Sequence, residues 1–264
     1  MSLFRIITHQ QNRLIMKTVK QILSFLFVLM VIVCLSSCEG AQYKKIDGQI
    51  CWTYRTFSFG EIVRPIDADT ITFTDLENHY GKDKSKAFWE DSLMTGVDVP
   101  SFKSVKLNYA VDKNHAYYKV DVIPGADPAS FEVNNENLSE DDKDYYWQQN
   151  PFHVNDKDRF KLFYIYGAEA TWGRDSKYGY YIEYNGNIIK FPISNHKDFE
   201  PLKYKDKDGD KLESDYATDG VNVYFKGKVV KGIDMATFKV TDNDWAVDKR
   251  TRYFRELATD SVPK

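Results

Sequence analysis

Apolar and polar segments alternate in a pattern that recurs along most of the chain. In its clearest copy, the apolar run Tyr109–Val111 is followed by the polar run 112–114 (Asp-Lys-Asn) and then by a second, aromatic run at 116–119. Aromatic and β-branched runs are typical of strands. An Asp-Lys-Asn segment favours a tight turn, because the Asp carboxylate can accept backbone N–H groups two residues on. The pattern therefore predicts a β-hairpin with its turn at Asp112.

The turn aspartate recurs at near-regular intervals. Successive copies are 29, 29, 34, 44 and 29 residues apart, at Asp83, Asp112, Asp141, Asp175, Asp219 and Asp248. A second series with a constant spacing of 29 has a Phe four residues after each member: Asp69, Asp98, Asp127 and Asp156, with the later pair Asp234 and Phe238 keeping the same offset. Self-similarity at a fixed period indicates a repeat architecture. The two longer intervals indicate insertions near residues 184–191 and 201–215.

The second series predicts a short helical turn between hairpins. Asp127 is a favoured N-cap residue, and Pro128 fits a first helical turn because its missing N–H would have no partner there. A unit of ~29 residues has room for two or three short strands but not for a propeller blade of ~40–45 residues. We expect an all-β fold of tandem β-hairpin repeats in a curved, solenoid-like or sheet array, with a closed ring as the alternative.

The repeated residues resemble those of the DKNYY family of bacterial repeat proteins, whose name describes a sequence like that of residues 112–118, Asp-Lys-Asn-His-Ala-Tyr-Tyr. The resemblance extends from Tyr54 to the C-terminal end. It implies this repeated build. The family has no established activity, so the resemblance implies no catalytic residues. Copies such as Asp219-Gly220-Val221 keep only the Asp of the name motif.

The N-terminal segment has the layout of a secretory signal. A 14-residue apolar run from Ile22 to Leu35 follows Lys17 and Lys20. As a helix it spans ~21 Å, which is too short for a hydrocarbon core of ~30 Å. Basic residues, an apolar run and small residues in this order are typical of a cleaved signal peptide. Met1 and Met16 both remain possible starts of translation.

The end of this segment, Leu35-Ser36-Ser37-Cys38, resembles the lipobox of bacterial lipoproteins. The resemblance implies cleavage before Cys38 and attachment of a diacylglyceryl group to its thiol, and a plain secretory signal is the alternative. Two or three acyl chains anchor a protein stably where one does not. We expect a signal peptide over 1–37, an anchor-proximal linker and first strand over 38–52, and a repeat domain over 53–264. The protein would be anchored by lipid to a membrane of the bacterial cell envelope, facing the periplasm or the surface.

Charge and motif content exclude several function classes. Residues 1–37 carry four basic side chains and no acidic one, so the net charge falls from −3 to −7 when they are removed. An acidic chain gives no reason to expect a nucleic-acid partner. The segment 206–210 resembles the start of a calcium loop, but Lys211 and Ala217 stand where that loop needs Gly and Glu. We expect no metal, no cofactor and no catalytic residues.

The strand after each turn predicts a row of aromatic side chains. Alternate residues of a strand point to opposite faces, and the residues four and six after the turn Asp are mostly apolar. On the other, more polar face, the position five after the Asp holds Tyr117, Tyr146, Tyr180, Tyr224 and Tyr253, with Phe88 in the first copy. These tyrosines could form a ribbon that contacts a glycan or an extended peptide. Alternatively they form a cross-strand ladder that only stiffens the sheet.

The sequence therefore favours a lipid-anchored, non-catalytic envelope protein that presents a β surface for protein or glycan binding. Its only cysteine beyond Cys38 is Cys51, which excludes an intrachain disulfide in the processed chain. One alternative is an envelope hydrolase that uses carboxylates in a pocket formed by the insertions near 184–191 and 201–215. Another is a purely structural envelope component.

Overall fold

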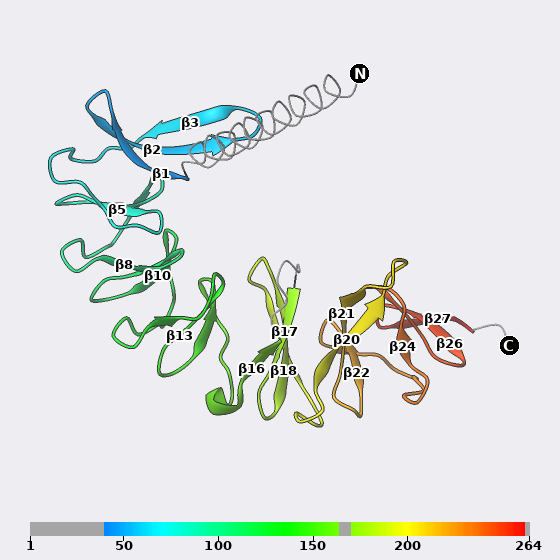
Figure 1. Cartoon of the computed structure of the whole chain (residues 1–264). Coiled ribbons are helices and arrows are strands. Elements are labelled where there is room, and N and C mark those ends of the chain that lie inside the picture. Colours follow the sequence, from blue (N-terminus) through cyan, green and yellow to red (C-terminus); the bar gives the residue numbers. More distant parts are fainter. Residues whose placement is uncertain (1–39, 164–169, 262–264) are drawn as a thin grey trace, which may run out of the picture. The chain divides into compact units, whose positions relative to one another are not determined.

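The computed structural model describes residues 40–163 and 170–261 (Figure 1). Cys38 and the expected signal peptide lie outside these ranges. The described residues form two compact units that divide between Leu93 and Met94. Nearly all regular structure in both units is antiparallel β-sheet. Across the described residues, none of the helical structure reaches the length and apolar character needed to cross a bilayer.

The first unit begins with a three-stranded meander. Strands β1 (Gln42–Ile46), β2 (Gln49–Thr56) and β3 (Gly60–Pro65) pair in chain order. Strand β2 thus runs through the expected boundary between residues 52 and 53. A four-stranded sheet follows, made of β4 (Thr74–Asp75), β5 (Tyr80–Lys82), β6 (Ala87–Trp89) and β7 (Ser92–Met94). Ile50, Ile66 and Phe88 form a buried cluster between the two sheets.

The second unit is a series of four-stranded meanders. The strands of successive sheets are β8 (Lys103–Lys106), β9 (Tyr109–Val111), β10 (Ala116–Tyr118) and β11 (Asp121–Val122); β12 (Glu132–Val133), β13 (Leu138–Glu140), β14 (Tyr145–Trp147) and β15 (Asn150–Pro151); β16 (Lys161–Phe163), β17 (Ala170–Arg174), β18 (Tyr178–Glu183) and β19 (Ile188–Pro192); β20 (Glu200–Lys205), β21 (Lys211–Thr218), β22 (Val223–Phe225) and β23 (Lys228–Val229); and β24 (Lys239–Val240), β25 (Trp245–Val247), β26 (Thr251–Phe254) and β27 (Leu257–Ser261). The all-β fold of tandem repeats is confirmed.

The number of strands per repeat differs from the expectation of two or three. Four fit because most strands are only two to four residues long, as in β8–β11. The predicted hairpin itself is confirmed: β9 and β10 pair with Tyr109 opposite Tyr118 and Val111 opposite Ala116. The expected helical turn is a 3₁₀-helix, η1 (Lys157–Arg159), in one copy. In another copy it is a single hydrogen-bonded turn, in which the Ser130 N–H donates to the Asp127 carbonyl at 3.3 Å.

The core lies between successive sheets rather than within any one of them. One buried cluster of the second unit joins Tyr109 and Tyr118 of one sheet to Tyr146 of the next. Further clusters repeat this arrangement along the unit, and one of them joins Trp172 of β17 to Tyr224 of β22. A sheet of such short strands cannot bury its apolar faces alone, so each repeat depends on its neighbours for stability.

Candidate functional site

The turn aspartate is a buried hydrogen-bond centre. In the clearest copy, Asp112 is 3% exposed. Its Oδ1 accepts the N–H groups of Asn114 at 2.7 Å and His115 at 2.8 Å. Its Oδ2 accepts the N–H of Asp98 at 2.7 Å and the hydroxyl of Tyr117 at 2.8 Å. One carboxylate thus closes its own turn and ties the hairpin to the preceding loop.

The same arrangement recurs around every turn aspartate. Each accepts the N–H groups two and three residues on and one N–H from the preceding loop, and in five copies it also accepts a tyrosine hydroxyl five residues on: Asp141 with Tyr146, Asp175 with Tyr180, Asp219 with Tyr224 and Asp248 with Tyr253 repeat the Asp112–Tyr117 pair. Asp83 has Phe88 at that position and keeps only the N–H donors and the Ser85 hydroxyl. The motif therefore fixes the fold of each repeat.

Of the two interpretations of the tyrosine row, the ribbon that contacts a ligand conflicts with the burial of its members. The five residues are each 2% exposed or less: Tyr117, Tyr146, Tyr180, Tyr224 and Tyr253. All three residues of β10 are buried: Tyr118 packs in the cluster that reaches Tyr146 of the next sheet, and the Tyr117 ring lies 5.9 Å from that of Phe102 in the preceding loop. Buried rings whose hydroxyl groups are bonded to a carboxylate have no free face for a ligand. These tyrosines stabilise the repeat.

The protonation state of this pair is well defined. Burial raises the pKa of the Asp112 carboxyl, but the hydrogen bonds from Asp98, Tyr117 and the turn N–H groups outweigh burial and hold the pKa below its usual value. At Asp248 the same balance lowers the pKa to about 2. Burial, together with the neighbouring carboxylate, raises the pKa of the Tyr117 hydroxyl. At neutral pH each pair is thus a carboxylate bound to a neutral phenol.

A second link between loop and turn was missed at the level of sequence. The Ser101 hydroxyl accepts the N–H of Lys113 at 3.0 Å, and Thr237 does the same for Lys249 at 3.1 Å. Equivalent bonds join Thr72 to Lys84 and Ser130 to Asp142. The signal was available, because a Ser or Thr precedes the repeated Phe in each of these copies. Its role is structural as well.

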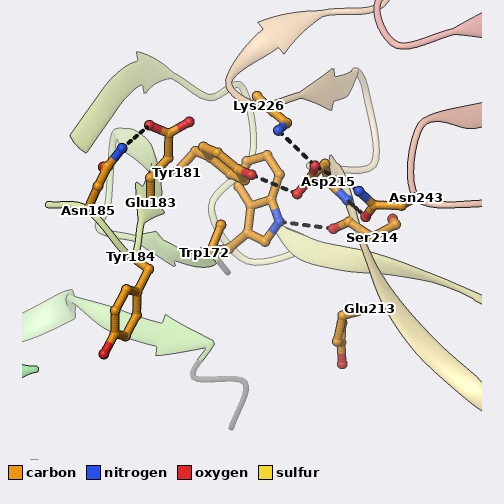
Figure 2. Close-up of a pocket in the computed structure, with 11 residues that line it drawn as sticks. Trp172, Tyr181, Glu183, Tyr184, Asn185, Glu213, Ser214, Asp215, Lys226 and Asn243 are labelled. Atoms are coloured by element: carbon orange, nitrogen blue, oxygen red, sulfur yellow. Dashed lines mark hydrogen bonds and ion pairs between the residues drawn. The ribbon is translucent and has the colours of Figure 1, made fainter. Parts of the chain in front are cut away.

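A pocket lies where the repeats are irregular (Figure 2). Its volume is about 620 Å³, and it is lined by residues of β17, β18 and β21 and of the turns after β18, β22 and β24: Ala170, Trp172, Tyr181, Glu183, Tyr184, Asn185, Glu213, Ser214, Asp215, Lys226 and Asn243. Strands β18 and β21 are six and eight residues long, whereas β10 has three. The lining includes residues from both expected insertions, near 184–191 and 201–215. The sequence therefore predicted where the repeat symmetry is broken.

Asp215 organises one wall of this pocket. Its Oδ1 accepts the hydroxyl of Tyr181 at 2.7 Å. Its Oδ2 lies 3.0 Å from the Lys226 ammonium and accepts the side-chain amide of Asn243 at 3.0 Å. Tyr181 and Asp215 belong to two successive sheets and Asn243 to the turn between β24 and β25 of the next, and Figure 2 shows them converging on one point. This carboxylate is therefore fully partnered and holds the wall rigid.

The opposite wall offers polar groups and an exposed ring. The Tyr184 side chain is 60% exposed and stands at the rim, apart from the Asp215 cluster in Figure 2. The Glu183 carboxylate accepts the amide of Asn187 at 2.9 Å and lies 3.5 Å from that of Asn185. Glu213 lies on β21 with Asp215, on the first wall, and pairs with Lys203 through one oxygen. The pocket thus combines an accessible aromatic ring with carboxylate and amide groups.

Metal binding finds no support among the residues that the structure describes. They contain no cluster of three or more His, Cys, Asp or Glu side chains that could hold a metal ion. In the segment that resembles a calcium loop, Oδ1 of Asp206 accepts the N–H groups of Asp208 and Asp210, each at 2.9 Å. The Asp206 carboxylate therefore caps its own turn.

These features define an all-β repeat protein in which a turn aspartate joins each hairpin to the loop before it. The DKNYY family matches residues 67–150 and 122–257, which together cover well over half of the chain. The chain belongs to the DKNYY family. The match begins just before β4, so the three-stranded sheet of β1–β3 precedes it. Neither curated proteins nor solved structures give a match.

Proposed function

We propose that this chain is a lipid-anchored, non-catalytic binding protein of the bacterial cell envelope, and that its pocket between β17, β18 and β21 takes a segment of a glycan. The observation that carries the proposal is the break in repeat symmetry. The buried aspartate–tyrosine pairs account for the repeated residues as structure, whereas the longer strands and the added turn contribute residues to the pocket of Figure 2. Residues at such a break are available for binding.

The chemistry of the pocket favours a glycan. Its volume of about 620 Å³ is in the range of small-molecule sites. A sugar offers hydroxyl groups to carboxylates and amides, and an apolar ring face to an aromatic side chain. Glu183 and Asn185 supply the polar groups, and Tyr184 supplies an accessible ring with few rotatable bonds.

Binding can be tested on the processed, full-length protein with an array of short oligosaccharides and extended peptides. Tyr184→Ala and Asn185→Ala should each lower affinity for a captured oligosaccharide about tenfold or more, since each removes ~1.5 kcal/mol of contact. Trp245→Ala is the matched control, because Trp245 is a partly exposed aromatic residue outside this pocket. Equal losses in all three variants, or capture of peptides alone, would contradict the glycan assignment.

The anchor is proposed from the resemblance of residues 35–38 to a lipobox. Cys38→Ser should leave the chain unprocessed or release it from the membrane, because the acyl chains supply the stable attachment. Fractionation of cells that express either form, followed by measurement of the mature mass, tests this point. A variant of mature size that stays in the membrane fraction would exclude lipidation at Cys38.

An envelope hydrolase is the second candidate, because three carboxylates line the pocket: Glu183, Glu213 and Asp215. Asp215 is bonded on both oxygens. Glu213 pairs with Lys203 through one oxygen only, and its Oε2 is buried with no hydrogen-bond partner among the described residues, so Glu183 and Glu213 are the remaining candidates. Release of reducing ends from a bound oligosaccharide, abolished by Glu183→Gln or Glu213→Gln but not by Trp245→Ala, would establish the hydrolase instead.

A further inference from the structure

The hairpin of β2 and β3 carries two unusually exposed aromatic side chains. Phe57 and Phe59 lie in its turn and are 109% and 81% exposed. The turn is ordered: Thr56 pairs with Gly60, and the Thr56 hydroxyl accepts the N–H of Phe59 at 3.1 Å. Two phenyl rings held in water at the tip of a fixed turn are an apolar surface with no partner inside the unit.

The register of the sheet places the start of β1 near this tip. Gln42 pairs with Thr53, so the chain enters the sheet three residues from Thr56, where the hairpin turn begins. At ~3.3 Å per residue, that separation is ~10 Å along the strand. The opposite end of the sheet is the turn between Ile46 and Gln49. The N-terminal entry of the chain and the aromatic tip therefore lie at the same end of this sheet.

The distance from Cys38 to this end is short. Gln42 is four residues along the chain from Cys38, and an extended chain of four residue steps reaches at most ~14 Å. Acyl chains on Cys38, on which this step rests through the proposed function, would bring the bilayer surface to within the reach of Phe57. The segment 56–60, Thr-Phe-Ser-Phe-Gly, carries no charge that would oppose entry.

We propose that the β2–β3 hairpin is a second membrane contact, which inserts Phe57 and Phe59 into the interfacial region of the bilayer that holds the Cys38 lipid. Aromatic side chains favour that region, where apolar rings leave water without crossing the membrane. Contact through apolar rings needs no attraction between the acidic processed chain and anionic lipid. The acyl chains tether one point, and the hairpin fixes how the first unit meets the membrane.

The test uses the processed, lipidated protein in vesicles of phosphatidylethanolamine and phosphatidylglycerol, with a nitroxide attached to Phe57→Cys. The matched control is Gln49→Cys, an exposed position at the other end of the same strand. The native Cys51 is 3% exposed, which protects it from labelling. At position 57 the nitroxide should collide with oxygen, which concentrates in the bilayer, several-fold more often than with a water-soluble nickel chelate. At position 49 collisions with the nickel chelate should be the more frequent.

A second variant checks the contribution of the rings themselves. Phe57→Ser with Phe59→Ser should speed the transfer of lipidated protein between vesicles several-fold, while the variant stays in the membrane fraction. Equal, water-like accessibility at positions 57 and 49 in membrane-bound protein would overturn the inference and leave the lipid anchor intact. Loss of the unsubstituted protein from the membrane fraction would instead overturn the anchor, and this inference with it.

Discussion

Asp219 accepts the hydroxyl of Tyr224 at 2.7 Å, and both side chains are buried. The same oxygen of Asp219 accepts the N–H of Ser194, which lies in the preceding loop, at 2.7 Å. The pair therefore does two things: it closes a hairpin and joins that hairpin to the loop before it. The repeat motif is a device for stacking sheets, and its frequency reflects the need to tie each four-stranded sheet to its neighbour.

Removing the hydroxyl from one such pair should destabilise the second unit measurably. Tyr224→Phe keeps the ring, which packs 4.8 Å from that of Phe191, but leaves the buried Asp219 carboxylate with one donor fewer. A hydrogen bond to a charged group is worth about 1.5–3 kcal/mol, so we expect a loss of about that size. Urea unfolding followed by circular dichroism measures it. An unchanged midpoint would show that water replaces the phenol without cost.

The first copy of the motif offers the reverse experiment. Phe88 occupies the tyrosine position, and Asp83 accepts the N–H of Asp69 at 2.7 Å through the oxygen that binds a hydroxyl elsewhere. Phe88→Tyr should supply the absent donor and raise the free energy of unfolding by about 0.5–1.5 kcal/mol. Phe88→Leu is the control, since it shortens the side chain without adding a donor and should be destabilising. A destabilised Tyr variant would mean that the hydroxyl does not reach the carboxylate.

Acid should weaken the fold through these carboxylates. The pKa values of Asp83, Asp112, Asp141, Asp175 and Asp219 are all lowered, because hydrogen bonds to each carboxylate outweigh its burial, and that of Asp248 falls to about 2. The unfolded value is ~3.9, so the contribution is fully present above that pH and is lost as the pH falls through the folded values. We expect the melting temperature to fall steeply between about pH 4 and pH 2. A melting temperature that is flat over this window would contradict the assignment.

The hairpins were predictable because their signals are local. The Asp112 turn and the strands on either side of it are encoded within ten residues, and the structure has them at 109–111 and 116–118. The burial of Tyr117 was not predictable from alternation alone, because alternation separates two faces without saying what covers the second. Here the preceding loop covers it, through the ring of Phe102 at 5.9 Å. The polar residues that make this strand face look accessible, such as His115, lie at the ends of the strand, where solvent reaches them.

The position of the pocket could be predicted, but not its chemistry. Unequal repeat lengths located the insertions near 184–191 and 201–215, since added residues must leave the regular array. The partners of Asp215 are Tyr181 at 34 residues' separation and Asn243 at 28. Such long-range contacts depend on how whole sheets pack, and no local pattern encodes them.

A small residue is required where β18 meets β19. Gly179 pairs with Phe191, and a Cβ on Gly179 would lie 2.4 Å from the Phe191 ring. The equivalent positions hold Ala87 and Ala116, so alanine itself suits the strand. Gly179→Ala should therefore destabilise the unit by about 1–3 kcal/mol through overpacking. Adding Phe191→Leu should recover part of that loss. Thermal unfolding of the single and the double variant measures both effects. Equal stability of the single variant and the parent would contradict the crowding.

Asp215 should matter for both the fold and the pocket. Asp215→Ala removes the partner of the Tyr181 hydroxyl, the Lys226 ammonium and the Asn243 amide together, and we expect a loss of about 2–4 kcal/mol. Asp244→Ala is the matched control. Asp244 is the same position one repeat later, where it pairs with Arg255 at 3.4 Å; the Asp244 side chain is 32% exposed and that of Arg255 53%, so its loss should cost less than about 1 kcal/mol.

The two substitutions should also differ in binding. The Asp215 cluster holds one wall of the pocket, so an oligosaccharide captured by the parent should bind the Asp215→Ala protein at least tenfold more weakly at a temperature where both are folded. The Asp244→Ala protein should bind it as the parent does, because Asp244 lies outside the pocket lining. Circular dichroism first verifies that both variants are folded. Calorimetric titration then measures their affinities, so a damaged pocket wall is distinguished from unfolding. Undiminished binding by Asp215→Ala would show that the ligand contacts a different surface.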